Sequence, residues 1–174
     1  MTTETTRPAT GPAHTGGHSA TGPQPSRTLD QVRAGRAHLH EYMHLLEAAI
    51  AKPAPGRNDA WVKHVHSTLV DLGAAFERHI AITEGPDGLF DEITKAAPRL
   101  AGGVGKLADE HKAIREAIAV ALDAIRHRSE AAPDSPETEG REAVIEVINQ
   151  LMRHRQRGAD LIYEAYQVDV GVGD

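Results

Sequence analysis

Apolar residues recur every three or four positions through four long segments of this 174-residue chain. In the second segment the repeat consists of Val62, Val65, Leu69, Leu72, Phe76, Ile80 and Thr83. This spacing gathers side chains on one face of an α-helix, and such a face must be buried against other helices. Four long amphipathic helices joined by short connections predict an all-α fold, an up-down-up-down four-helix bundle.

Prolines and glycines set the limits of these helices. We expect the first helix over about residues 29–52 and the second from about Asn58 to the break at Gly85-Pro86. A short helix is expected over Leu89–Ala97. The last two long helices should flank an exposed, acidic and proline-rich loop at 128–139.

The first 27 residues differ in composition from the rest of the chain. They are mostly Thr, Gly, Pro, Ala and His, with almost no large apolar side chains. Such a segment cannot bury enough surface to offset the entropy lost on ordering, so we expect a disordered tail over residues 1–27. The bundle is expected to form one domain over residues 28–174.

The composition excludes several classes of protein. Cysteine is absent, which excludes disulfides, thiolate-bound metals and cysteine nucleophiles. A formal net charge of −6 argues against binding nucleic acid through its phosphates. No apolar segment is long enough to span a bilayer or to serve as a signal peptide. We therefore expect a soluble, cytoplasmic protein with neither a nucleic-acid nor a membrane partner.

Histidines lie on or beside the apolar repeats of three helices, namely His79, His111 and His154. His40 lies at the edge of the repeat in the first helix, nearer to it than His38 or His44. A buried imidazole is costly unless both nitrogens are satisfied, by hydrogen bonds or by a metal. One such residue is usually structural, but one on each of several helices favours a shared metal or cofactor, since imidazole binds zinc, iron and copper.

Helical rise provides a check on whether these histidines can meet. At about 1.5 Å per residue, His111 and His154 come out level when counted from the loop between their helices. Counted in the same way, His40 comes out roughly 10 Å short of the level of His79. Three of the four histidines are therefore expected to converge more readily than the fourth.

Four segments carry a family resemblance: His79-Ile-Ala-Ile-Thr-Glu-Gly-Pro-Asp-Gly-Leu-Phe, Leu107-Ala-Asp-Glu-His, His154-Arg-Gln-Arg-Gly-Ala-Asp-Leu-Ile-Tyr and Asp169-Val-Gly. Over residues 29–174 the chain resembles the hemerythrin-like, HHE cation-binding family. The resemblance implies a four-helix bundle that holds a non-haem di-iron centre through inward histidines and bridging carboxylates. Members of that family bind O2 or NO, sense redox state, or act on peroxide and iron.

The resemblance implies one histidine ligand from each helix, which would be His40, His79, His111 and His154 in this chain. The two carboxylates that bridge the irons in the family fall on Thr83 and Gly158. The chain therefore keeps the histidines and lacks the bridging groups.

Three hypotheses follow for the cofactor. In the first, one or two irons, or zinc, bind the histidines, with Glu84 and water completing the coordination. In the second, haem b is bound axially by histidine, and Thr83 and Gly158 make room for the porphyrin. In the third, the chain is a metal-free structural or interaction module, and single replacements of His79, His111 or His154 by Leu or Gln cost little stability.

The first hypothesis is the main expectation. It predicts an iron-binding protein that binds, or performs redox chemistry on, a small diatomic or peroxide ligand through His79, His111, His154 and His40. If the protein is an enzyme, an iron- or haem-dependent oxidoreductase is expected. The sequence leaves the oligomeric state open.

Overall fold

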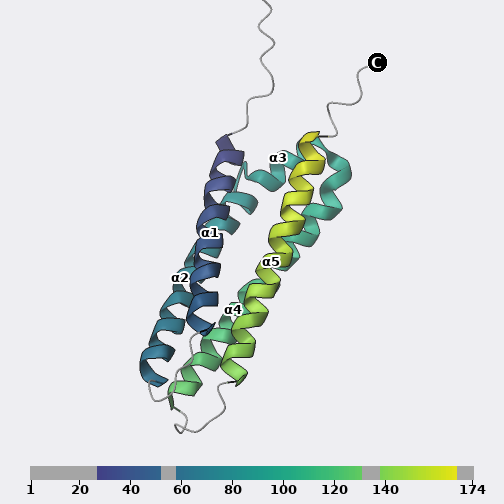
Figure 1. Ribbon diagram of the computed structural model, residues 1–174. Coiled ribbons are helices and arrows are strands. Elements are labelled where there is room, and N and C mark those ends of the chain that lie inside the picture. Colours follow the sequence, from purple (N-terminus) through teal and green to yellow (C-terminus); the bar gives the residue numbers. More distant parts are fainter. Residues whose placement is uncertain (1–26, 52–57, 131–137, 168–174) are drawn as a thin grey trace, which may run out of the picture.

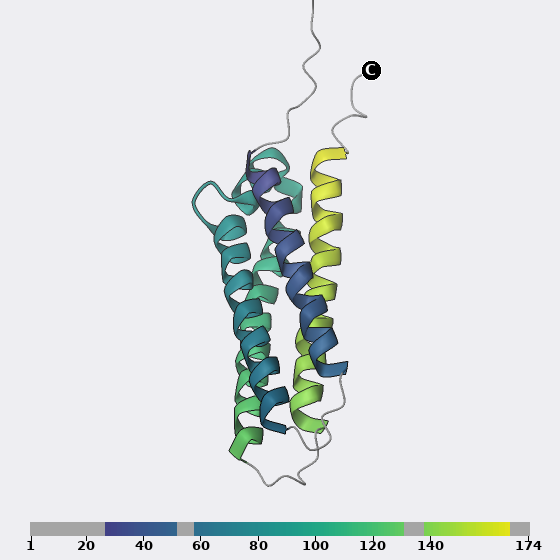
Figure 2. The ribbon, with the colours of Figure 1, turned by 60° about the vertical axis from the view of Figure 1, so that its left-hand side comes forward.

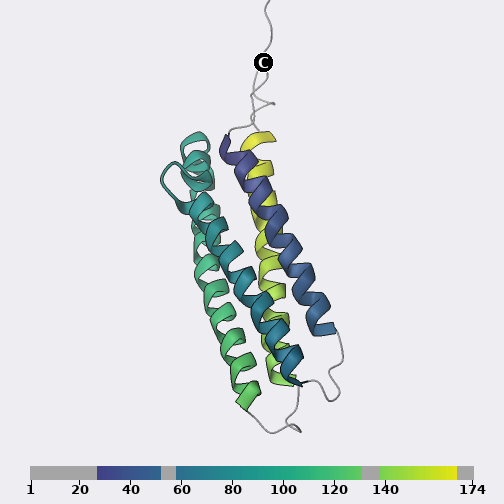
Figure 3. The same cartoon turned by 90° about the vertical axis from the view of Figure 1, so that its left-hand side faces the viewer.

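A computed structural model describes residues 27–51, 58–130 and 138–167. Four long helices make up most of these residues: α1 (Arg27–Ala51), α2 (Asn58–Glu84), α4 (Ala101–Glu130) and α5 (Thr138–Gln167). They lie side by side, and helices that follow one another in the chain run in opposite directions (Figures 1 and 3). The predicted all-α, up-down-up-down four-helix bundle is confirmed.

A short helix, α3 (Leu89–Ala96), and a 3-10 turn (Pro98–Leu100) connect α2 to α4. The helix α3 lies across the end of the bundle at which α1 begins and α5 ends (Figures 1 and 2). Its inward face buries Leu89, Phe90 and Ile93. The helix α3 thus closes the end of the bundle that lies nearest to the buried histidines.

The end of α2 shows why the chain breaks where the sequence predicts. A side chain at Gly85 would place its Cβ 2.3 Å from the carbonyl oxygen of Ala81, so only glycine fits there. Asp87 then takes a positive φ of 55°, and the Gly88 N–H donates to the carbonyl of Gly85 at 2.8 Å. The resulting tight turn sends the chain directly into α3.

Some helix limits differ from the expected ones. The helix α1 begins at Arg27, two residues earlier than predicted, and α4 continues to Glu130, past the expected start of the loop at 128. Most of that loop, residues 1–26 of the tail predicted at 1–27, and the Asp169-Val-Gly segment lie outside the described residues, whereas Arg27 belongs to α1. Among the described residues, no helix has the combined length and apolar character needed to cross a bilayer.

The buried apolar residues form two clusters along the bundle. The larger cluster is built from all four long helices and includes Leu46, Leu69, Phe76, Ile114 and Leu151. The smaller cluster lies under α3, and its members are Val32, Leu89, Phe90, Ile93, Ala97, Leu100, Leu107 and Leu161. The buried histidines lie where the two clusters meet, since the ring of Phe76 contacts all three from the larger cluster and the ring of Phe90 contacts His111 from the smaller one.

A candidate metal centre

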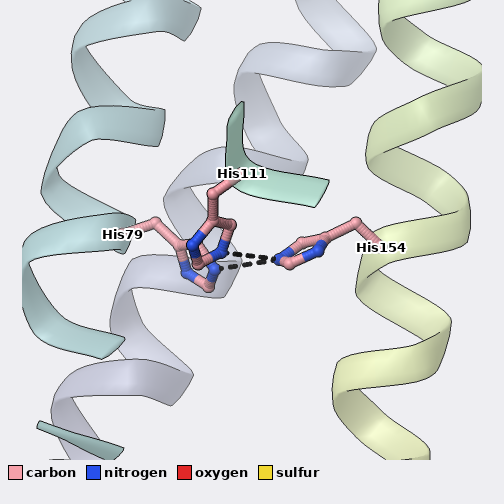
Figure 4. Close-up of side chains that lie close together, drawn as sticks. All are labelled: His79, His111 and His154. Carbon is pink, nitrogen blue, oxygen red and sulfur yellow. Dashed lines mark hydrogen bonds between the residues drawn. The ribbon is translucent and has the colours of Figure 1, made fainter. Parts of the chain in front are cut away.

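Three histidines from three helices point to one place in the core (Figure 4). His79 on α2, His111 on α4 and His154 on α5 are 7%, 0% and 4% exposed. The Nε2 atom of His154 lies 3.3 Å from Nε2 of His79 and 3.2 Å from Nε2 of His111. The structure thus brings together the three histidines that the sequence placed on the apolar repeats.

Aromatic side chains hold these imidazoles in place. Phe90 stacks on His111 with ring centroids 5.6 Å apart and an interplanar angle of 10°. Phe76, one turn before His79 on α2, contacts all three imidazoles, including His111 edge-on at 5.6 Å. The rings therefore have little freedom to turn away from their common centre.

Carboxylates bind the outer nitrogens of two of the rings. Nδ1 of His111 lies 2.5 Å from Oε1 of Glu84, and Nδ1 of His154 lies 3.0 Å from Oε2 of Glu110. The other oxygen of Glu110 pairs with Nε of Arg157 at 2.5 Å. An ionised carboxylate only accepts hydrogen bonds, so both imidazoles carry their proton on Nδ1 and present a bare lone pair at Nε2.

These lone pairs face one another. Two neutral rings with protons on Nδ1 have no hydrogen to share across the 3.2 Å between the Nε2 atoms of His111 and His154. His79 can donate from its own Nε2 to His154, but the lone pair of His111 is still unmatched. Nδ1 of His79 is buried and has no hydrogen-bond partner among the described residues. Hydrogen bonds among the three imidazoles therefore cannot satisfy all of their nitrogens. A cation between the Nε2 atoms would satisfy the lone pairs that face one another.

At neutral pH, a proton is a poor candidate for the cation between these Nε2 atoms. Burial, and then the charges of His154, His111 and Arg36, lower the pKa of His79 to about 3. Burial also lowers the pKa of His154 to about 4, although Glu110 opposes the shift. The pKa of His111 is lowered by burial in the same way, against the effect of Glu84. The buried rings therefore stay neutral near pH 7, which is the state that binds metals.

The two separations between Nε2 of His154 and the Nε2 atoms of the other histidines fit a metal ion. Histidine nitrogens bind zinc at about 2.0–2.1 Å, so two of them on a tetrahedral ion lie about 3.3 Å apart. In the structure, the separations from Nε2 of His154 are 3.3 and 3.2 Å. Carboxylates that accept a hydrogen bond from the outer nitrogen are also the usual partners of metal-binding histidines, because they fix the tautomer.

Comparisons with protein-family models, with curated proteins and with solved structures found no match to this chain. The resemblance to hemerythrin-like proteins therefore stays a prediction.

His40 is not brought to the cluster. Its half-exposed ring lies instead on the surface between α1 and α5, where Nδ1 accepts a hydrogen bond from Nη1 of Arg155 at 2.8 Å. Nε2 of His40 lies 3.0 Å from Nε2 of His44, whose other nitrogen contacts Glu47 at 3.0 Å. These contacts satisfy His40 without a metal.

Glu84, the carboxylate predicted as a ligand, lies on the outer side of His111 and contacts Nδ1 rather than the centre of the cluster. Thr83 is buried, but its hydroxyl lies 2.9 Å from the carbonyl of His79 and 3.2 Å from that of Ile80. It donates within its own helix. Neither side chain occupies the position of a bridging carboxylate.

A small cavity adjoins the cluster on the side of Thr83 and Gly158. Its volume is about 30 Å³, and its walls include His79, His154, Thr83 and Gly158. Apart from its chain neighbours and the backbone of its own helix, no atom lies within 4 Å of where a Cβ on Gly158 would be. A single water needs about 10–15 Å³ of such space, so one or two waters, or a diatomic molecule, fit beside the histidines.

Proposed function

We propose that this protein binds one transition-metal ion through the Nε2 atoms of His79, His111 and His154, with an open position for a small ligand. The observation that supports it most strongly is the meeting of three buried, neutral imidazoles whose Nε2 atoms cannot all be satisfied by hydrogen bonds to one another, because a bond from His79 to His154 leaves the lone pair of His111 unmatched. Three histidines with an open fourth position are a common catalytic arrangement for metals in proteins.

A mononuclear site is favoured over a di-iron centre. Two cations held close together need bridging anions, and the described residues around the cluster supply none. Glu84 and Glu110 are both bound to outer imidazole nitrogens, and Thr83 is bonded within α2. One ion, by contrast, needs only the three nitrogens and an exogenous ligand.

Iron is the metal that the resemblance implies, and it would supply redox chemistry when bound. The chain supplies the donors, the fixed tautomers, and a cavity of about 30 Å³ that limits the ligand to the size of O2, NO or peroxide. If the protein turns over a substrate, it is then an iron-dependent oxidoreductase. The same three nitrogens are suitable for zinc, which would bind without redox activity.

The haem alternative finds less support. The cavity beside Thr83 and Gly158 is far too small for a porphyrin with the side chains in their present positions. Two arginines near His154 in the sequence are also engaged, because Arg153 pairs with Glu146 and Arg157 with Glu110. A haem would require both the bundle and these ion pairs to rearrange.

The metal content of the purified full-length chain tests the proposal. We expect about one iron or zinc ion per chain, weak absorption without a Soret band, and a higher melting temperature with metal than in a chelator. His111→Ala should lose the ion. The exposed His127, on the same helix, provides the control, and His127→Ala should keep it.

Two results would overturn the proposal. If the purified protein contains no metal and its melting temperature does not change on adding iron or zinc, the structural-module hypothesis is favoured. Full metal loading of His111→Ala would show that the ion binds elsewhere.

A further inference from the structure

Arg36 on α1 is a half-buried arginine in the wall of the cavity beside the histidine cluster. Its Nη2 donates to the backbone carbonyl of Arg155 on α5 at 3.2 Å. No carboxylate among the described residues pairs with it. Its pKa is lowered by burial and then by the charge of Arg155, with no acidic group acting in the other direction. A guanidinium thus lies close to the proposed metal without a counter-charge.

No other wall of the cavity supplies the missing negative charge. The side chains from α3 and α4 are apolar, namely Leu89, Phe90, Ile93 and Leu107. The helix α2 contributes His79 and Thr83, and α5 contributes His154, Arg155 and Gly158. The two nearby carboxylates, Glu84 and Glu110, are bound to imidazole nitrogens and do not line the cavity.

A metal ion in this cluster would add to the imbalance. Three neutral imidazoles add no negative charge to a divalent ion, and of the two carboxylates behind them Glu110 is already paired with Arg157. The buried site would therefore keep a net positive charge, and burying net charge in a core is costly. A ligand that brings a negative charge would offset that cost, and a nearby guanidinium would strengthen its binding through charge-assisted hydrogen bonds.

We propose that the ligand at the open metal position is a small inorganic anion of no more than about three heavy atoms, and that Arg36 is the residue that selects for its negative charge. This inference rests on the proposed metal site. The cavity volume of about 30 Å³ sets the upper limit of size.

Arg36 is better placed for this role than Arg155. The Arg155 side chain is exposed and donates to Nδ1 of His40 at 2.8 Å. Arg36 uses one described hydrogen bond, to a neutral carbonyl, and its guanidinium has five N–H donors in all. Its remaining donors are available to an anion that enters the cavity.

A purely structural role for Arg36 is the competing explanation, since its bond to Arg155 joins α1 to α5. The two roles differ in what they predict for charge. If Arg36 only joins α1 to α5, its loss should change the affinity for charged and neutral ligands alike. If Arg36 selects anions, its loss should change the affinity for the charged ligand alone.

The test uses the full-length chain loaded with Co²⁺, whose visible spectrum reports ligand binding. Azide serves as the anion and nitric oxide as a neutral ligand of similar size. Arg36→Met should weaken azide binding about tenfold or more, because a hydrogen bond to a charged group is lost. Arg36→Lys should recover most of the affinity. Nitric oxide binding should change less than about threefold in either variant.

Arg33→Met is the matched control, because Arg33 is exposed on the same helix and pairs with Asp30. It should bind azide as the unaltered chain does. Azide affinity that is unchanged by Arg36→Met would overturn the inference and leave the metal site intact. An equal loss of azide and nitric oxide affinity, with a lowered melting temperature, would overturn it in favour of a purely structural role for Arg36. Failure of the unaltered chain to take up Co²⁺ would overturn the proposed metal site, and this inference with it.

Discussion

Replacing Glu110 by alanine should weaken metal binding without unfolding the bundle. The substitution removes the acceptor for Nδ1 of His154, at 3.0 Å, and the partner of Arg157, at 2.5 Å. Loss of such a carboxylate partner typically costs 10- to 100-fold in metal affinity, roughly 1.4–2.7 kcal/mol. Arg157 is 47% exposed, so the loss of its ion pair adds little.

The surroundings of Glu110 place the effect near the lower limit of that range. A cleft of about 190 Å³ between α4 and α5 is lined by Glu110, Gln150, Arg153 and Arg157. It is large and polar enough for a water to enter and accept the hydrogen bond from Nδ1 of His154. We therefore expect a loss of affinity close to tenfold.

Titration of the metal-free chain with Zn²⁺ in competition with a chelating dye measures this affinity. Glu116→Ala is the control, because Glu116 is exposed on the same helix. The Zn²⁺ affinity of Glu110→Gln should lie between those of the unaltered chain and Glu110→Ala, since an amide oxygen still accepts the hydrogen bond from His154 but carries no charge. Equal Zn²⁺ affinity in Glu110→Ala and Glu116→Ala would refute the idea that Glu110 prepares His154 as a ligand.

Three further predictions concern stability. In a chelator, His79→Leu should be at least as stable as the unaltered chain, because it removes a buried Nδ1 that has no hydrogen-bond partner among the described residues. In saturating metal, the unaltered chain should be the more stable of the two. Urea unfolding under both conditions checks this. The free energy of unfolding of the metal-free chain should fall as the pH drops from about 6.5 toward about 4, by up to about 1.4 kcal/mol per pH unit for each histidine. The sign follows because the pKa values of His79 and His154 are lowered to about 3 and about 4, so the unfolded chain binds more protons in this range; a flat profile in buffered urea titrations would contradict it. Gly158→Ala should stabilise the chain by up to about 1 kcal/mol, because α5 gains helix propensity and nothing outside the adjoining backbone of α5 lies within 4 Å of the added Cβ position; a lower melting temperature than that of the unaltered chain would show that the methyl group meets an obstacle.

The sequence predicts the bundle and the three buried histidines for the same reason. Apolar spacing identifies the face of each helix that must be buried, and His79, His111 and His154 lie on or beside those faces. Any bundle that buries the repeats brings such residues inward, and similar heights along the helices then bring them together. No knowledge of how the helices are rotated against one another is needed for this.

The remaining features depend on that rotation and on side-chain reach. Glu110 follows Asp109 in the sequence and precedes His111, yet it binds His154 on another helix. The position of Glu84 beyond the repeat likewise gives no sign that it contacts Nδ1 of His111. His40 lies at the edge of its repeat, where a small rotation of α1 decides between the core and Arg155. Periodicity alone cannot resolve such boundary positions.

X-ray absorption at the edge of the bound metal tests the central claim most directly. The proposed site predicts about three imidazole nitrogens at about 2.0–2.1 Å in the metal-loaded chain, one or two further oxygen or nitrogen ligands, and no second metal within about 4 Å. A metal–metal distance of about 3.5–4 Å, the scattering of a porphyrin, or a shell that survives in His111→Ala would contradict it.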